Sequence, residues 1–399
     1  MVSSIGLYVT AFLACYTPLF SSAIPLHRVR DTRTYIVKLK SGIAPGSHLS
    51  SSSFAQYNER VYDSRVLNGY AIGLTPDAME VLKAKYAEQI EYVEEDQTVY
   101  STSAIIQNDA TWGLQRISHN ATLPQGSSAT SLNYTYRYDS SGGEGVDIYV
   151  FDTGVYIEHE EFGGRATHAP VFIDNSAPGD RYGHGTHCAG TAAGTRYGVA
   201  KKANIIDVKV LSDNGSGSVS AIIAGLSWAV ANAKSTNRPG VISMSLGGFG
   251  PSTGAQADAV RQTVASGLAV VVAAGNEASS ATEWTPANVD EAIVVGNLDI
   301  SDGQYRTSNY GPTLDVFAPG VNVVSAGITG PSATKVDTGT SMSAPHVAGI
   351  VAYLLSLEGP RTPAELSARI VELATPSVLS GLSPNTTNLV AQLPRRVAI

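Results

Sequence analysis

Three side chains, far apart in the sequence, are of the types that together perform acyl transfer. Asp152 ends an apolar run, His184 opens a stretch of small residues, and Ser341 lies at the start of a predicted helix. Acyl transfer needs a nucleophile, a base that takes its proton, and an acid that orients the base. The three residues supply these roles in the chain order Asp, His, Ser. They therefore predict a serine-dependent hydrolase.

Each of these segments also has another interpretation. The Asp-Thr-Gly that begins at Asp152 occurs in aspartic proteases, but those enzymes need two such segments and this chain has one. His184 and His187 could be zinc ligands, although no Glu follows His184 as a zinc-protease helix requires. Ser341 could simply cap its helix. A lipase would want Gly-x-Ser-x-Gly, which residues 339–343 do not match. A catalytically silent binding protein also remains as an alternative.

The elements that must position these residues alternate between strands and helices. Short apolar runs predict buried parallel strands at 146–152, 205–211, 241–246, 269–274 and 292–296. Helical periods lie between them at 184–193, 219–233 and 256–266. Repeated alternation predicts an α/β fold with a mostly parallel sheet, helices on both faces, and reactive groups at the carboxyl ends of the strands.

The N-terminal part has a different pattern. Strands are expected at 34–40, 66–74 and 90–100, and helices at 53–62 and 77–86, which together predict a small α+β unit over about 34–101. Residues 101–108 are interpreted as a joint between this unit and the rest of the chain.

Composition and the first residues suggest an exported protein. The chain is 43% hydrophobic and only 15% charged, which excludes disorder for most of its length. Its net charge is −8 without a basic run, so nucleic acid is not an expected partner. Residues 1–23 are interpreted as a secretory signal peptide, with small residues Ser21 and Ala23 before the cut. No later apolar run is expected to reach membrane-spanning length, so we expect a soluble, secreted, extracellular protein with no membrane contact.

Two kinds of side chain bear on modification after export. Removal of Cys15 with the signal leaves Cys188 as a single thiol, which we expect to be buried, inert and close to His184, four residues earlier. Four Asn-x-Ser/Thr sequons are candidate glycosylation sites, of which about half are expected to be used: Asn120, Asn133, Asn214 and Asn385.

The segments 150–154, 183–190 and 339–349 resemble those of the subtilisin-like serine proteases (subtilases), and most closely the proteinase K-like members. Matching blocks run from Trp112 to Leu389, including 197–203, 209–211 and 213–217. The resemblance implies a three-layer subtilisin-like fold at 104–399. Residues 24–103 resemble the subtilisin propeptide, with a ferredoxin-like inhibitor and chaperone domain at about 34–101. The resemblance also implies an autoprocessed zymogen of broad specificity, with a mature N-terminus near Ala104.

The resemblance also assigns roles to individual residues. Ser341 matches the nucleophile, His184 the general base and acid, Asp152 the residue that orients it, and Asn276 the side-chain oxyanion donor. The substrate is expected to bind as an added strand, with Glu277 at the mouth of the S1 pocket. The substrate-binding residues implied are Gly215, Ser216, Gly217, Ser245, Leu246, Gly247, Ala273, Ala274, Gly275 and Glu277.

The same resemblance implies a structural calcium ion held by Asp290, Ala292 and Asp315, and no organic cofactor. Expected partners are polypeptide substrates and the chain's own propeptide, and the enzyme is expected to be a monomer. Three features depart from the family pattern. The chain cannot form an internal disulfide after export, Val219 stands where proteinase K has a Tyr on the S4 rim, and 118–144 is longer than the family segment.

Overall fold

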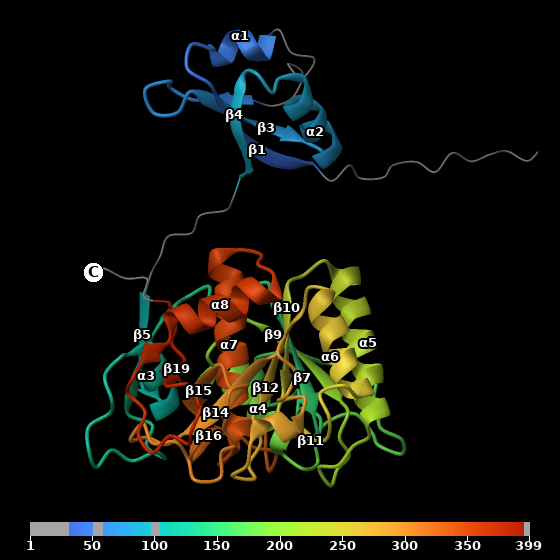
Figure 1. Cartoon of the computed structure of the whole chain (residues 1–399), viewed down its shortest axis with the longest axis vertical. Coiled ribbons are helices and arrows are strands. Elements are labelled where there is room, and N and C mark those ends of the chain that lie inside the picture. The colour runs from blue at the N-terminus through green and yellow to red at the C-terminus, as the bar shows by residue number, and fades with distance from the viewer. Residues whose placement is uncertain (1–31, 51–58, 97–103, 395–399) are drawn as a thin grey trace, which may run out of the picture. The chain divides into compact units, whose positions relative to one another are not determined.

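The computed structural model describes residues 32–50, 59–96 and 104–394 of the chain (Figure 1). The chain divides into two compact units, residues 1–101 and 102–399, and each is described by itself. The predicted signal peptide lies outside the described residues, as does the joint up to residue 103.

The N-terminal unit is a four-stranded antiparallel sheet in the order β2-β3-β1-β4. Strands and helices follow one another as βαββαβ, the ferredoxin-like arrangement. The elements are β1 (Arg33–Leu39), α1 (Pro45–Ser50), β2 (Glu59–Val61), β3 (Gly69–Leu74), α2 (Pro76–Lys85) and β4 (Ile90–Glu95).

Alternation along the strands builds the core of this unit. In β1, Val37 and Leu39 are buried while their neighbours are exposed or half-buried, as a period of two requires. Helix α2 adds Met79 and Leu82, three residues apart on one face. The unit therefore has a hydrophobic core of its own.

The prediction of one helix in this unit is wrong for its C-terminal residues. We expected a helix at 53–62, but Glu59–Val61 forms β2 and pairs with β3. Residues 53–58 lie outside the described residues. Helix α1 was not predicted. Pairing with a neighbouring strand overrides the local helical preference, because sheet hydrogen bonds depend on residues that are distant in sequence.

The second unit contains a nine-stranded sheet in the order β18-β19-β15-β14-β12-β10-β7-β9-β8, in which only the β18–β19 pairing is antiparallel. Its strands are β7 (Asp147–Asp152), β8 (Ala166–His168), β9 (Asn204–Lys209), β10 (Gly240–Met244), β12 (Ala269–Ala273), β14 (Ile293–Leu298), β15 (Val316–Pro319), β18 (Thr375–Pro376) and β19 (Leu389–Val390).

Helices cover both faces of this sheet. Helices α5 and α6 pack together on one side, and α4 and α7 pack together on the other (Figure 1). The helices are α3 (Trp112–Ser118), η1 (Glu160–Phe162), α4 (His184–Ala193), α5 (Val219–Thr236), α6 (Ala255–Ala265), η2 (Ala281–Glu283), α7 (Thr340–Glu358) and α8 (Pro363–Leu373). The predicted three-layer α/β architecture is confirmed.

Three two-stranded ribbons stand outside the large sheet: β5 (Ala104–Ala110) with β6 (Tyr134–Asp139), β11 (Gly248–Phe249) with β13 (Trp284–Thr285), and β16 (Val323–Ala326) with β17 (Thr334–Asp337). The first corrects the interpretation of 101–108 as a joint, because Ala104 onward is a strand. Its partner β6 lies within the long 118–144 segment.

Helix α7 corrects another expectation. Among the described residues it alone is long and apolar enough to cross a membrane, although we expected no later run of that kind. Because 83% of this apolar stretch is buried inside the protein, α7 is a core helix.

Candidate active site

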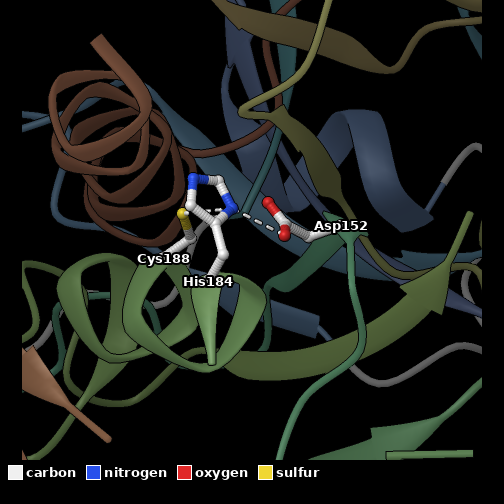
Figure 2. Close-up of side chains that lie close together, drawn as sticks. All are labelled: Asp152, His184 and Cys188. Carbon is white, nitrogen blue, oxygen red and sulfur yellow. Dashed lines mark hydrogen bonds and ion pairs between the residues drawn. The ribbon is translucent and has the colours of Figure 1, made fainter. Parts of the chain in front are cut away.

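The aspartate and the histidine lie where a strand and a helix meet. Asp152 is the last residue of β7, fully buried, and His184 is the first residue of α4. His184 Nδ1 lies 2.7 Å from Asp152 Oδ1. Figure 2 shows the imidazole ring between this carboxylate and the Cys188 side chain. Gly183 precedes the helix with φ 88°, a left-handed conformation that suits glycine. The carboxyl edge of the sheet and the helix start thus form an acid–imidazole pair.

A second aspartate, which sequence analysis missed, holds the start of α4 in place. Asp180 Oδ1 accepts hydrogen bonds from Gly183 N (2.8 Å) and Thr153 Oγ1 (2.9 Å). Asp180 Oδ2 accepts from Thr186 N (2.9 Å) and Thr186 Oγ1 (2.7 Å). The carboxylate therefore satisfies free N–H groups at the helix terminus and ties it to the residue after Asp152. An Asp shortly before a predicted helix was the signal available in the sequence.

Two opposing effects set the pKa of His184. Burial is the largest single effect and lowers it, but the attraction and hydrogen bond of the Asp152 carboxylate, together with the neighbouring Cys188, raise it further, so the pKa lies well above its usual value. Cys188 lies beside the ring as well, yet burial raises the pKa of its thiol. Asp152 is therefore the main group that raises the pKa of His184, ahead of Cys188.

The serine lies at the start of α7, close to this pair. The carbonyl oxygen of Ser341 accepts hydrogen bonds from Ser245 Oγ at 2.8 Å and from Cys188 Sγ at 3.3 Å. Cys188 Sγ is in turn 4.0 Å from His184 Nδ1. Among the described residues, the hydrogen bond of Ser341 Oγ goes to the Ser245 carbonyl oxygen, at 3.4 Å, and not to His184. The structure thus brings Asp152, His184 and Ser341 into one neighbourhood.

Asn276 lies next to the serine with its amide group oriented by the same helix. Its Oδ1 accepts hydrogen bonds from Thr340 N (2.9 Å) and Thr340 Oγ1 (3.2 Å). Because Oδ1 is held in this way, the Nδ2 end is free to donate to another group. Asn276 and Ser341 line the same cavity, so an amide donor and a hydroxyl border one space.

All the residues that were expected to bind substrate line two neighbouring cavities. One, of about 200 Å³, is lined by Ser341 and Asn276, and the other, of about 430 Å³, is lined by His184 and Val219. Ser245, Leu246 and Gly247 border both. Ala273, Ala274, Gly275 and Glu277 line the first, and Gly215, Ser216 and Gly217 line the second. Sequence analysis missed five residues of the first cavity: Trp284, Thr285, Pro286, Ala287 and Thr340.

The expected burial of Cys188 beside His184 is confirmed, and its inertness stays a prediction. Cys188 is unpaired, buried and in contact with His184. Asp152, His184 and Cys188 are also the set of possible metal ligands found among the described residues. The zinc alternative fails for His187, whose Nε2 bonds the Val323 carbonyl oxygen at 2.9 Å in the core, so it does not join His184.

The residues expected to hold calcium have suitable chemistry. Ala292 and Asp315 lie just before β14 and β15, which are parallel neighbours. Asp315 Oδ2 accepts from Val294 N at 2.7 Å, and burial together with the nearby Asp290 carboxylate raises the pKa of Asp315 to about 6. The expected ligands are two backbone carbonyl oxygens and one carboxylate, and these are the hard oxygen donors that calcium prefers. These are the amino ends of the strands, at the opposite edge of the sheet from Asp152.

All four sequon asparagines are exposed: Asn120, Asn133, Asn214 and Asn385. Asn214 differs from the others because its Oδ1 accepts a hydrogen bond from Ser216 Oγ at 2.6 Å, and Ser216 lines the second cavity. A glycan at Asn214 would therefore stand beside that cavity.

A parallel α/β sheet whose carboxyl edge gathers an Asp–His pair, a serine and an amide donor defines a protein of the serine peptidase class. A model of the subtilase family, Peptidase_S8, matches residues 143–392. The chain belongs to the subtilase family of subtilisin-like serine peptidases.

Its relatives include fungal proteases. It is 41% identical to Subtilisin-like protease 1 of Pseudogymnoascus destructans over 92% of this chain and 93% of that protein. It is 40% identical to the cuticle-degrading protease of Metarhizium anisopliae, over 90% of this chain and 88% of that protein. A crystal structure of a cold-adapted subtilisin-like serine proteinase matches with a TM-score of 0.64 and 39% identity, over 71% of this chain and 98% of that one.

The His184–Asp152 pair predicts the pH dependence of activity. A protonated imidazole cannot accept a proton, so activity should fall as pH decreases through the pKa of His184. In Asp152→Asn the attraction is lost while burial remains, so this pKa should fall. NMR titration of His184 measures it directly, with Ser341→Ala as the parent to prevent self-digestion. A pKa that is equal or higher in the Asn variant would contradict the assignment.

Proposed function

We propose that the protein is a secreted serine endopeptidase of broad specificity, which hydrolyses peptide bonds through an acyl-enzyme. The observation that carries the proposal is the cluster of Asp152, His184 and Ser341 beside the Asn276 amide. In this mechanism His184 takes the proton of Ser341 Oγ as the hydroxyl attacks the scissile carbonyl carbon. For this step Ser341 Oγ must turn from the Ser245 carbonyl oxygen toward His184, a rotation about one side-chain bond.

The remaining groups act on the charges that develop during the reaction. Asp152 orients the imidazole and stabilises its positive charge. Asn276 Nδ2 donates to the oxyanion of the tetrahedral intermediate, with the amino end of α7 close by. His184 then returns its proton to the leaving amine, and water repeats the sequence to release the acyl group.

We infer that the substrate binds as an extended strand between residues 245–247 and 215–217. Backbone groups on both sides of the second cavity would supply its hydrogen bonds, and glycine allows the two backbones to approach closely. Val219 and Leu246 line that cavity and would contact apolar side chains of the substrate. The binding partners that we propose for this site are therefore polypeptides.

We further propose the domain roles of a zymogen. Residues 1–23 would be the signal peptide, 24–103 an inhibitory propeptide and 104–399 the peptidase. Two observations support this division: unit 1 has its own core, and the fungal relatives match about nine-tenths of the chain, well beyond the family region that starts at residue 143. The similarity to a cuticle-degrading protease supports the proposal that this chain acts outside the cell.

The Ser341→Ala variant tests both the mechanism and the processing. We expect the parent to lose its propeptide and the variant to remain a precursor that lacks only its signal, because self-cleavage needs the nucleophile. Expression in a host free of related proteases, followed by mass spectrometry, measures both chains. Normal maturation of the variant would contradict autoprocessing, and a parent without peptidase activity would contradict the proposed function itself.

We also propose cleavage after large apolar P1 residues, with tolerance of Lys. Small residues 273–275 leave volume in the first cavity, and the exposed Glu277 also lines it. A Lys ammonium could reach this carboxylate on its long alkyl stem, for a gain of about 0.2–1 kcal/mol that salt would screen.

The comparison of P1 Lys and P1 Leu peptides measures this gain. In Glu277→Gln the Lys-to-Leu ratio of kcat/KM should fall at low salt, while the P1 Phe-to-Leu ratio is the internal control. The Gln side chain keeps an oxygen for the local hydrogen bonds, so the change removes mainly the charge. An unaltered Lys-to-Leu ratio would exclude Glu277 from specificity.

A calcium ion held by Asp290, Ala292 and Asp315 is proposed to stabilise the fold, without a part in the reaction. An ion that binds only the folded state adds about 2.7 kcal/mol at 100 times its dissociation constant. We expect the melting temperature of the Ser341→Ala protein to be higher in calcium than in chelator. Asp315→Asn should abolish this difference, whereas an equal calcium effect in that variant would contradict the assignment.

A further inference from the structure

Asn309, in the loop between β14 and β15, makes several hydrogen bonds to the loop that carries Asn276. It is fully buried. Its Oδ1 accepts hydrogen bonds from Glu277 N (3.0 Å), Ser279 N (3.1 Å) and Ser279 Oγ (3.4 Å). Its Nδ2 donates to the Ala274 carbonyl oxygen (3.0 Å) and to Glu277 Oε2 (2.7 Å). Both ends of this one amide are thus committed to residues 274–279.

The backbone of that loop is shaped around Asn309. The Asn309 N–H donates to the Gly275 carbonyl oxygen at 2.9 Å. A Cβ on Gly275 would lie 2.2 Å from Asn309 Nδ2, and Gly275 has φ +104°. The amide therefore packs directly on loop backbone, at a distance that a larger residue at 275 would not allow.

The loop also holds a strained residue two positions after the proposed oxyanion donor. Ala278 has φ 51°, a left-handed conformation that is unfavourable for alanine. Asn309 Oδ1 accepts the N–H groups on either side of it, those of Glu277 and Ser279. Strain of this kind persists only where surrounding contacts determine the conformation, and Asn309 provides two of those contacts.

Asn276 depends on the hydrogen bonds of Asn309 to this loop, because Asn276 is exposed and lies outside regular structure. Its side chain is held by Thr340 through Oδ1, and its N–H donates to Glu277 Oε2 at 2.8 Å, the same oxygen that accepts from Asn309 Nδ2. The Asn276 backbone is thereby linked to Asn309 through one carboxylate.

We propose that Asn309 is a positioning residue that holds the 274–279 loop so that Asn276 Nδ2 points at the developing oxyanion. The inference rests on the proposed function. An oxyanion donor contributes because it is aligned before charge develops. Loss of the Asn309 amide should therefore lower kcat more than it raises KM, since the alignment matters most in the transition state.

A double-mutant cycle between Asn309→Ala and Asn276→Leu tests this role. Loss of the oxyanion donor in a subtilisin, a member of this family, costs about 10²–10³ in kcat, which is the upper bound for a residue that acts through it. We expect Asn309→Ala alone to lower kcat by about 10- to 100-fold with KM within about threefold. In the Asn276→Leu background the same change should cost less than about threefold, because the donor is already absent.

Rates are measured on a peptide anilide, with active sites titrated and chain termini matched by mass spectrometry. Gln392→Ala is the matched control, because it removes a buried amide that bonds the Arg116 carbonyl oxygen at 2.9 Å rather than this loop. It should leave kcat within about twofold of the parent in both backgrounds. If Asn309→Ala does not fold, Asn309→Asp replaces it. The Asp side chain has the same shape as Asn, but a carboxylate oxygen replaces the Nδ2 that donates to the Ala274 carbonyl oxygen and to Glu277.

The outcomes separate the inference from the function on which it rests. Equal fold losses from Asn309→Ala in both backgrounds would mean a general structural role and would overturn the inference. So would a kcat near that of the parent in the folded single variant. A parental rate in Asn276→Leu would instead reject the oxyanion role of Asn276, and the inference with it.

Discussion

The close packing of α4 against α7 is the contact on which the site depends. A Cβ on Gly349 would lie 2.6 Å from Val199 Cβ and 2.8 Å from the Ala192 carbonyl oxygen. Small residues therefore let α7 approach α4 and the segment that follows it. Because the two helices begin with His184 and with Thr340-Ser341, their approach brings the imidazole and the hydroxyl together. Cys188, one turn into α4, fills the space between them and bonds the Ser341 carbonyl oxygen.

The same helix start also sets the position of the amide donor. Thr340 holds Asn276 Oδ1 from one side, while Asn309 holds the loop from the other. The proposed nucleophile, Ser341, and Thr340, which orients the amide, are thus neighbours in the chain, so a movement of α7 would displace both in the same direction. The Ser341 hydroxyl and the Asn276 amide therefore keep their position relative to each other, although Asn276 itself lies on an exposed loop.

The two edges of the sheet carry different tasks. The carboxyl ends of the strands hold Asp152 and the two cavities, where backbone and polar groups are free because the strands have ended. The amino ends of β14 and β15 bring Asp315 and Ala292 together, far along the strands from the reacting groups. The calcium ion proposed for that edge would therefore lie away from the proposed reacting groups.

The sequence by itself determined the reacting residue types, their chain order and the alternation of strands and helices. Asp152, His184 and Ser341 lie in local segments whose periodicity predicts a strand end and two helix starts, so their neighbourhood follows from the general geometry of parallel sheets. The burial of Cys188 beside His184 followed for the same reason, since residues four apart share a helix face. The small residues along 184–193 likewise gave a helix with the correct bounds.

Only the tertiary structure decided which distant groups hold these residues in place. Asp180 offered only its place before a predicted helix, and Asn309 resembles an ordinary loop residue. The roles of both come from hydrogen bonds to partners that the fold brings near. Strands β2 and β5 were missed for a related reason, because a strand exists through its pairing with another segment. Local pattern fixes what a segment can form, whereas hydrogen bonds between remote segments decide which possibility is stable, and those bonds have no signature within the segment itself.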